Sequence, residues 1–155
     1  MNFRITGLSP EPFRPYFGLS DAELASLGAR RYVTEAGSGY PDRVSLTDLS
    51  PGERVLLVNH QHQSELTPYR ASHAIYVREG EGAAFDAVNE VPPALRSRVL
   101  SLRGFDASHM IVEGDLVDGT AVEGLIETML ANPEVSYIHA HFAKRGCYAA
   151  KITRG

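Results

Sequence analysis

The feature of the sequence that most constrains the fold is the short spacing between its strand-like segments. The closing segment, EVSYIHAHFAKRGCYAAKIT, contains two such runs joined by Ala143 to Gly146, and glycine suits a hairpin turn that needs positive φ. The strand-like segments 99–106 and 109–117 are separated by even less. Parallel strands need a crossover of a dozen or more residues, so we expect mainly antiparallel pairing.

Two segments carry helix signals. Residues 20–23, Ser-Asp-Ala-Glu, fit a capping box and predict a helix over about 21–31. Residues 120–123, Thr-Ala-Val-Glu, fit a second capping box, and an apolar stripe follows it until Asn132-Pro133. The sequence therefore predicts an α+β fold in a single domain, residues 1–155. We expect a predominantly antiparallel curved sheet of about seven strands with two main helices.

Composition excludes several classes of protein. Apolar residues make up 43% and charged residues 22% of the chain, which is typical of a globular protein. The net charge is -4 and the basic residues are scattered, so we expect no nucleic-acid partner. The aliphatic run VLLV (55–58) is too short to span a membrane, and the single cysteine cannot form an internal disulfide. These observations favour a cytoplasmic protein without a membrane partner.

The histidines form two His-x-His pairs on strand-like segments. Alternation puts His60 and His62 on one face of their strand, and likewise His139 and His141. Four imidazoles from two strands could bind one metal such as zinc. The alternative is that they are strand-end residues hydrogen-bonded to backbone or water, without a cofactor. We expect no cofactor, with the zinc site as the alternative.

Alternation in the penultimate strand also predicts which side faces the core. Val135, Tyr137, His139 and His141 point one way, and the opposite set, Ser136, Ile138, Ala140 and Phe142, has the composition of a core face. The histidine side is then either a pocket wall or part of a strand that leaves the core.

Further candidate site residues lie in two segments. Cys147 is a candidate nucleophile beside His139 and His141 as catalytic residues, although a lone cysteine is more often a small buried hydrophobe. The candidate substrate-binding residues are Tyr69, Arg70, Ser72 and Tyr148. Arg70 could bind a carboxylate or phosphate with both guanidinium nitrogens, or pair with an acidic side chain instead.

These residues support three functional hypotheses. The first is an enzyme or binding protein for a small anionic molecule, in which Arg70 holds the anion and His139 or His141 transfers protons. The second is a non-catalytic interaction or structural module, for which a homodimer is one arrangement. The third is a metal-binding protein that uses the two His-x-His pairs.

Four segments together resemble a known family. They are FRITGLSPEPFRPYFGLSDAELASLGARR, GYPDRVSLTDLSPGERVLLVN, PYRASHAIYVRE and YIHAHFAKRGCYAAKITR. The combination resembles the bacterial family named domain of unknown function 1203, a family without an assigned activity. The family pattern often has cysteine at the position of Asp42 and Gly-Pro at His73-Ala74. The resemblance therefore implies a shared site near residues 68–72 and 146–148, and gives no catalytic role to His73.

Overall fold

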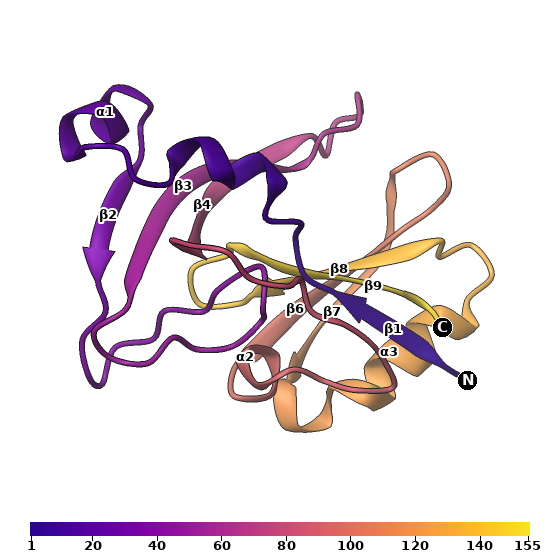
Figure 1. Ribbon diagram of the computed structural model, residues 1–155. Coiled ribbons are helices and arrows are strands. Elements are labelled where there is room, and N and C mark those ends of the chain that lie inside the picture. Colours follow the sequence, from indigo (N-terminus) through magenta and orange to yellow (C-terminus); the bar gives the residue numbers. More distant parts are fainter.

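The computed structural model describes residues 1–155 and contains two antiparallel sheets (Figure 1). The larger sheet has six strands in the order β5-β1-β9-β8-β6-β7, and the smaller has three in the order β2-β3-β4. The α+β class and the antiparallel pairing are confirmed. The expected single sheet of about seven strands is wrong, because the strands divide between two sheets with separate hydrophobic cores.

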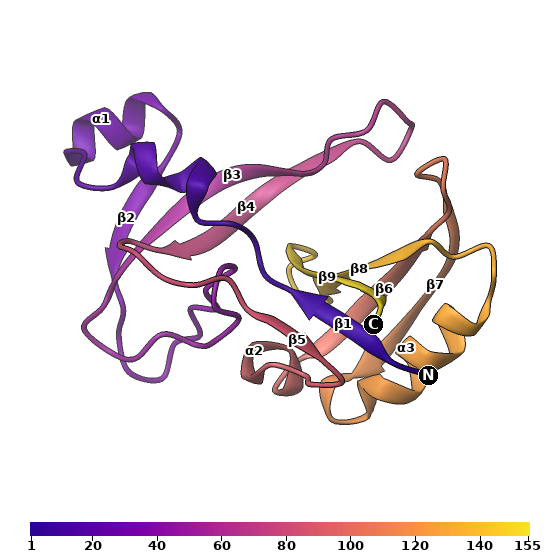
Figure 2. The ribbon, with the colours of Figure 1, turned by 45° about the vertical axis from the view of Figure 1, so that its right-hand side comes forward.

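The six-stranded sheet is packed on one face against the helix α3, Val122–Ala131 (Figure 2). The strands are β1 (Phe3–Thr6), β5 (Asp86–Val88), β6 (Val99–Phe105), β7 (Ile111–Asp118), β8 (Tyr137–Phe142) and β9 (Tyr148–Arg154). Ile126 and Met129 of α3 share the larger core with Leu102, Ile138 and Ile152 of the sheet. The other face of this sheet is therefore left for a second layer.

The three-stranded sheet carries the smaller core. It consists of β2 (Arg30–Val33), β3 (Arg54–Gln63) and β4 (Ala71–Arg78), and it is accompanied by a 3₁₀ helix, Glu11–Tyr16, and by α1, Asp21–Ser26. Leu56, Val58, Ile75 and Val77 of the sheet pack with Leu24 of α1. In Figures 1 and 2, the β3–β4 hairpin extends from this core toward the turn between β6 and β7. The Thr67 hydroxyl at its tip donates to the His109 carbonyl at 3.3 Å.

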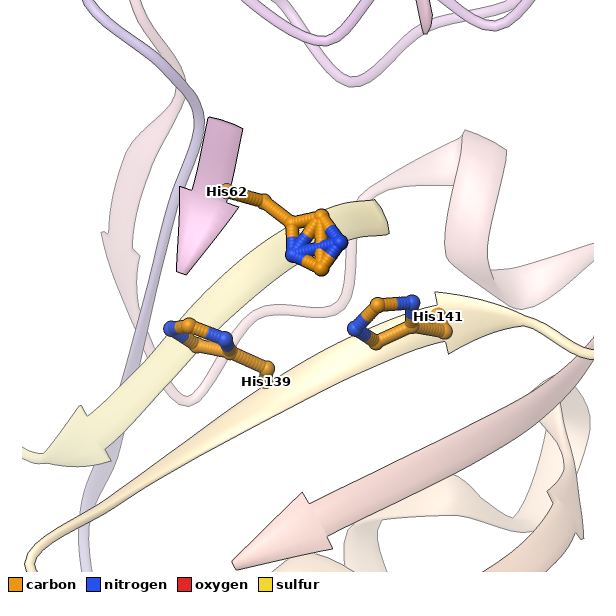
Figure 3. Close-up of side chains that lie close together, drawn as sticks. All are labelled: His62, His139 and His141. Carbon is orange, nitrogen blue, oxygen red and sulfur yellow. The ribbon is translucent and has the colours of Figure 1, made fainter. Parts of the chain in front are cut away.

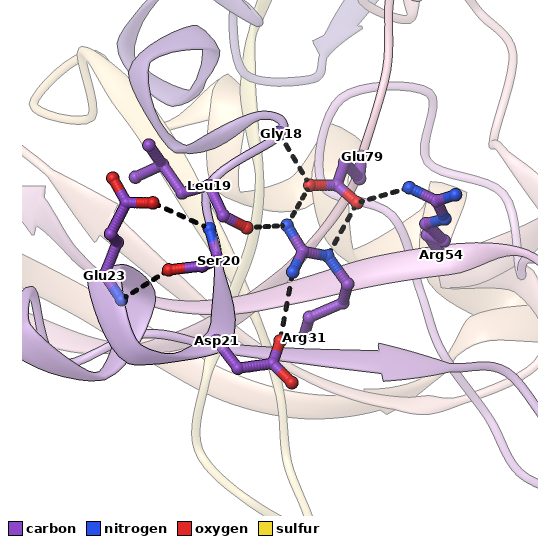
Figure 4. Close-up of polar contacts among 8 residues, drawn as sticks. All are labelled: Gly18, Leu19, Ser20, Asp21, Glu23, Arg31, Arg54 and Glu79. Carbon is purple, nitrogen blue, oxygen red and sulfur yellow. Dashed lines mark hydrogen bonds and ion pairs between the residues drawn. The ribbon is translucent and has the colours of Figure 1, made fainter.

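The first predicted helix begins as expected but ends early. Ser20 and Glu23 form the predicted capping box (Figure 4). The helix ends at Ser26 rather than near residue 31, because Gly28 takes a φ of 74° and Arg30 already pairs with Leu57 of β3. Strand pairing thus overrides the helical pattern of this segment.

The second capping box is not formed. Thr120 lies inside a short 3₁₀ helix, Gly119–Ala121, and Asp118 accepts from the Thr120 amide at 3.0 Å instead. The α-helix behind it still matches the apolar stripe. A further short helix, α2, is formed by Pro93–Arg96. No helix is long and apolar enough to cross a membrane.

The closing hairpin matches the prediction closely. Gly146 takes a φ of 80°, as its place in the turn requires, and donates its amide to the Phe142 carbonyl at 2.8 Å. Ile138, Ala140 and Phe142 face the larger core as predicted. Val135 also joins that core, contrary to the alternation, because it precedes the first residue of β8. The histidine face of β8 is consequently the face opposite α3.

Candidate metal centre

Strand register places polar side chains in rows on the sheet face opposite α3. Arg103 of β6 pairs with His139 of β8, which pairs with Lys151 of β9. Directly paired residues of antiparallel strands share a face, so these three side chains form one row. His141 similarly pairs with Ser101 and with Tyr148. Two histidines of one strand thus lie between cationic and aromatic neighbours.

A third histidine reaches this face from the other sheet. His62 lies near the end of β3, and its ring is directed toward the rings of His139 and His141 (Figure 3). One nitrogen from each ring belongs to a set whose members all lie within 4.8 Å of one another. Tetrahedral zinc with bonds of about 2.1 Å would hold such nitrogens roughly 3.4 Å apart, so small side-chain rotations would bring them onto one metal ion.

Each histidine of this cluster has a ring nitrogen that is not used in a hydrogen bond and is available to bind a ligand. His141 donates from Nδ1 to the Gly146 carbonyl at 2.9 Å, which leaves the lone pair on Nε2. Such a bond to a backbone carbonyl is the usual support of a metal-binding histidine. Nδ1 of His62 and Nδ1 of His139 are buried without any partner. An unpaired buried polar atom costs about 1–3 kcal/mol, so a ligand for these atoms would remove a real penalty.

The surroundings keep the three histidines neutral. Burial, reinforced by the neighbouring histidines and by Lys151 and Arg103, lowers the pKa of His139 to about 3. Burial chiefly lowers the pKa of His62 and of His141 to about 4, and the charge of Arg103 adds to both shifts. Neutral imidazole is the form that binds a metal. A histidine with so low a pKa is, in contrast, poorly suited to proton transfer near pH 7.

The aromatic neighbours define the walls of the cluster. The Tyr148 ring is stacked on His62 with ring centroids 5.6 Å apart, and it lies edge-on to His139 and His141. Burial raises the pKa of Tyr148, so its phenol stays neutral. On the other side, the Phe105 ring lies 4.9 Å from that of His139. The histidine nitrogens are therefore enclosed mainly by apolar ring faces.

A second polar network adjoins these walls. The hydroxyl of Tyr137 accepts from Nε2 of Gln63 at 3.0 Å and contacts Nδ1 of His109 at 2.7 Å. Nε2 of His109 lies 3.9 Å from a carboxylate oxygen of Glu65. Nothing in the sequence pattern had singled out His109, which reaches Tyr137 through the turn between β6 and β7.

The other predicted site residues are spread over the molecule. The His60 ring lies against Phe13 and does not belong to the converging set of nitrogens. Tyr69 contacts the Phe105 ring, whereas Arg70 and Ser72 are exposed. Cys147 is buried on the far side of the closing turn, at 3.0 Å from a guanidinium nitrogen of Arg43. The structure thus joins His62, His139, His141 and Tyr148, and separates them from Arg70, Ser72 and Cys147.

Two cationic residues of these regions were missed from the sequence. Arg103 was detectable, because Leu100 and Leu102 face the core and alternation then puts Ser101 and Arg103 on the histidine face. Arg43 carried no such signal. Only the tertiary fold shows that its guanidinium, 1% exposed, donates to the backbone of Tyr148.

The fold and the cluster define the class as an α+β protein with a buried histidine cluster where two antiparallel sheets meet. The chain belongs to the family described as a protein of unknown function (DUF1203), whose model matches residues 39–154. The match includes three of the four segments that carry the resemblance and all residues of the histidine cluster. No curated protein and no solved structure matches the chain.

Proposed function

We propose that the protein binds one divalent transition metal of the zinc class through His62, His139 and His141, and that the metal acts on a small anionic molecule. The observation that carries the proposal is the convergence of two buried imidazoles, His139 and His141, with the half-buried His62. Nδ1 of His62 and Nδ1 of His139 have no partner. Imidazole-only sets suit zinc and its transition-metal neighbours, whereas magnesium and calcium prefer oxygen ligands.

Charge around the cluster supports the anionic substrate. Arg103 is half-buried in the row of His139, and its guanidinium forms neither a hydrogen bond nor an ion pair. Burial lowers its pKa. Lys151, in the same row, lies with its Nζ 4.9 Å from the centre of the Tyr137 ring. These two cations repel a bare metal ion, so a metal held here is best balanced by an anion in its open coordination position.

The site supports a catalytic rather than a purely structural metal. Three protein ligands leave a fourth position for water, and zinc lowers the pKa of such a water to about 7. The protein would then supply three neutral ligands, the Gly146 carbonyl that orients His141, and Arg103 to hold the anion. We infer metal-assisted hydrolysis or hydration of a small anion as the class of reaction.

Supporting observations also favour a small-molecule partner over a macromolecule. Two of the three clustered histidines are buried, and the chain has a net charge of -4, which disfavours nucleic acid. The single cysteine is free, as in proteins of a reducing compartment, and we propose the cytoplasm as the location.

Metal titration of chelator-treated, untagged protein tests the proposal. We expect one zinc per chain by calorimetry and elemental analysis, and visible bands of tetrahedral cobalt when Co²⁺ replaces zinc. Loss of a residue that merely supports a ligand costs about 10–100-fold in affinity, so His62→Gln, His139→Gln and His141→Gln should each cost more.

The matched control is His60→Gln, which changes a histidine of the same strand outside the cluster and should leave zinc affinity unchanged. Added phosphate or acetate should shift the cobalt bands, and this shift should need a higher concentration in Arg103→Met. Equal zinc affinity in all four histidine variants, or no zinc binding by a folded protein, would overturn the metal proposal and favour a non-catalytic module.

A further inference from the structure

A hollow of about 390 Å³ lies on the other side of the closing turn from the histidine cluster. Its wall includes Arg43, Arg98, Phe142, Lys144, Arg145 and Cys147, and no acidic residue lines it. Four basic side chains around one cavity of this size create a strongly positive potential, because the surrounding protein screens charges less than water does.

Arg43 forms the floor of this hollow with its charge unpaired. The residue is 1% exposed, and its guanidinium donates to the Pro41 carbonyl at 2.6 Å, the Tyr148 carbonyl at 2.8 Å and Sγ of Cys147 at 3.0 Å. None of these acceptors is a carboxylate. Burial lowers the pKa of Arg43 to about 10, and it remains charged at neutral pH. A buried charge of this kind normally has a counterion.

The other three cations differ in how far they are neutralised. Arg98 forms a two-pronged pair with Asp48, at 2.6 and 3.0 Å. Lys144 and Arg145, in the turn between β8 and β9, are exposed and form no ion pair. The Arg43 and Arg98 guanidinium carbons lie 4.8 and 5.1 Å from the centre of the Phe142 ring, and this ring gives the hollow an apolar surface. The wall as a whole keeps an excess of positive charge.

We propose that this hollow binds a small organic anion whose carboxylate or phosphate group is held by Lys144 and Arg145, with the buried charge of Arg43 attracting it from below. The volume lies in the range of small-molecule sites and is too small for a folded partner. Arginine presents paired N–H groups that match either anionic group, while Phe142 and Tyr76 accept the less polar part of the molecule. This site is separate from the histidine cluster and does not depend on the proposed metal.

The test uses metal-free full-length protein, with inorganic phosphate and malonate as separate probes at constant ionic strength. We expect a saturable rise in the melting temperature with at least one probe. The amide NMR signals of residues 143–147 should shift with the same midpoint, whereas those of the β3–β4 turn, 64–70, should not. A response to phosphate alone would indicate a site for phosphate groups, and a response to malonate alone would indicate a site for carboxylates.

The variant pair Lys144→Ala/Arg145→Ala should weaken binding by about tenfold or more, since each charge-assisted hydrogen bond contributes a sizeable part of small-ligand affinity. The matched control is Arg30→Ala/Arg70→Ala, which removes two exposed arginines outside the hollow. Equal weakening in both pairs would show nonspecific screening and overturn the proposal. Absence of a saturable response to both probes would do the same. Since His62→Gln should bind the anions normally, failure here is distinct from failure of the metal site.

Discussion

At the scale of single residues, His139 shows a conflict between stability and ligand binding. It is 5% exposed, its Nδ1 has no partner, and its own row contributes two cations. In a protein selected for stability alone, an apolar residue of similar volume would fill this position. Retaining a polar group at such a cost is typical of functional sites, where stability is commonly sacrificed.

Replacement of this histidine should therefore stabilise the metal-free protein. We expect His139→Leu to raise its stability by about 1 kcal/mol, because the change removes an unpaired buried nitrogen and keeps most of the volume. In thermal melts this corresponds to about 2–4 °C. The same variant should lose metal binding.

The control for this change is His141→Leu. It removes the hydrogen bond to the Gly146 carbonyl at 2.9 Å and should lower the melting temperature. If His139→Leu were destabilised as much as His141→Leu, the unpaired nitrogen could not be the source of the cost.

The side of a strand on which a residue lies can be predicted from the sequence, whereas contacts between distant elements cannot. Alternation was sufficient to place His139 and His141 on a common side of their strand, because the side-chain period within a strand is purely local. The sequence could not predict that His62, without His60, joins His139 and His141. This convergence depends on how β3 bends at the irregularity between His60 and Gln63 and on the packing of one sheet against the other.

At the scale of elements, an ion-pair network fixes α1 and β2 against β4. The Arg31 guanidinium donates to both carboxylate oxygens of Glu79, at 2.8 and 2.7 Å, and to the Leu19 carbonyl at 2.6 Å (Figure 4). Glu79 also accepts from the Gly18 amide at 3.1 Å. The Glu79 side chain is only 7% exposed, so its contacts are little screened by solvent.

We expect Glu79→Gln to destabilise the protein by about 2 kcal/mol, because it leaves the partly buried Arg31 with only the exposed Asp21 as counter-charge. The Arg31 hydrogen bonds lower the pKa of Glu79. The contribution of this carboxylate is therefore present above its unfolded pKa and is lost as the pH falls through the lower folded value. Urea titrations at neutral and acid pH measure both effects.

Asp21→Asn provides the comparison, since Asp21 contacts the same Arg31 from a side chain that is 90% exposed. It should change stability far less than Glu79→Gln. A similar loss in both variants would mean that the network stabilises through net charge rather than through the enclosed pair.

At the scale of the whole molecule, the irregular segment around Arg43 connects the two sheets. Its amide donates to the Tyr76 carbonyl in β4, and its guanidinium donates to the Tyr148 carbonyl in β9. Leu46 takes a φ of 56°, so this segment does not continue as an extended strand. The pattern of this segment could not reveal its role, because its partner Tyr148 lies 105 residues away along the chain.

The whole metal-free protein should lose stability as the pH falls from about 6.5 toward 4. Unfolded histidines take up protons near pH 6.5, whereas His62, His139 and His141 in the fold do so only near 4, 3 and 4. The unfolded state thus binds more protons in this range, and stability must decrease with acidity. The positive charges of Arg103 and Lys151 oppose protonation of His139.

Melting temperatures measured from pH 7 to pH 4 test this expectation. The slope should be smaller in His139→Leu, which removes one of the histidines whose pKa burial lowers. His60→Gln should reduce the slope too, because burial also lowers the pKa of His60. A slope that is identical in wild type and His139→Leu would contradict it.

The turn between β8 and β9 has a consequence for how the two proposed sites behave together. Its Gly146 carbonyl orients His141, while Cys147 and the Tyr148 carbonyl accept from Arg43. One short segment thus forms part of the wall of both sites. Any change of its conformation on binding at one site alters the free energy of binding at the other. By thermodynamic linkage, any factor by which a bound metal changes the affinity for the anion equals the factor by which the anion changes the affinity for the metal.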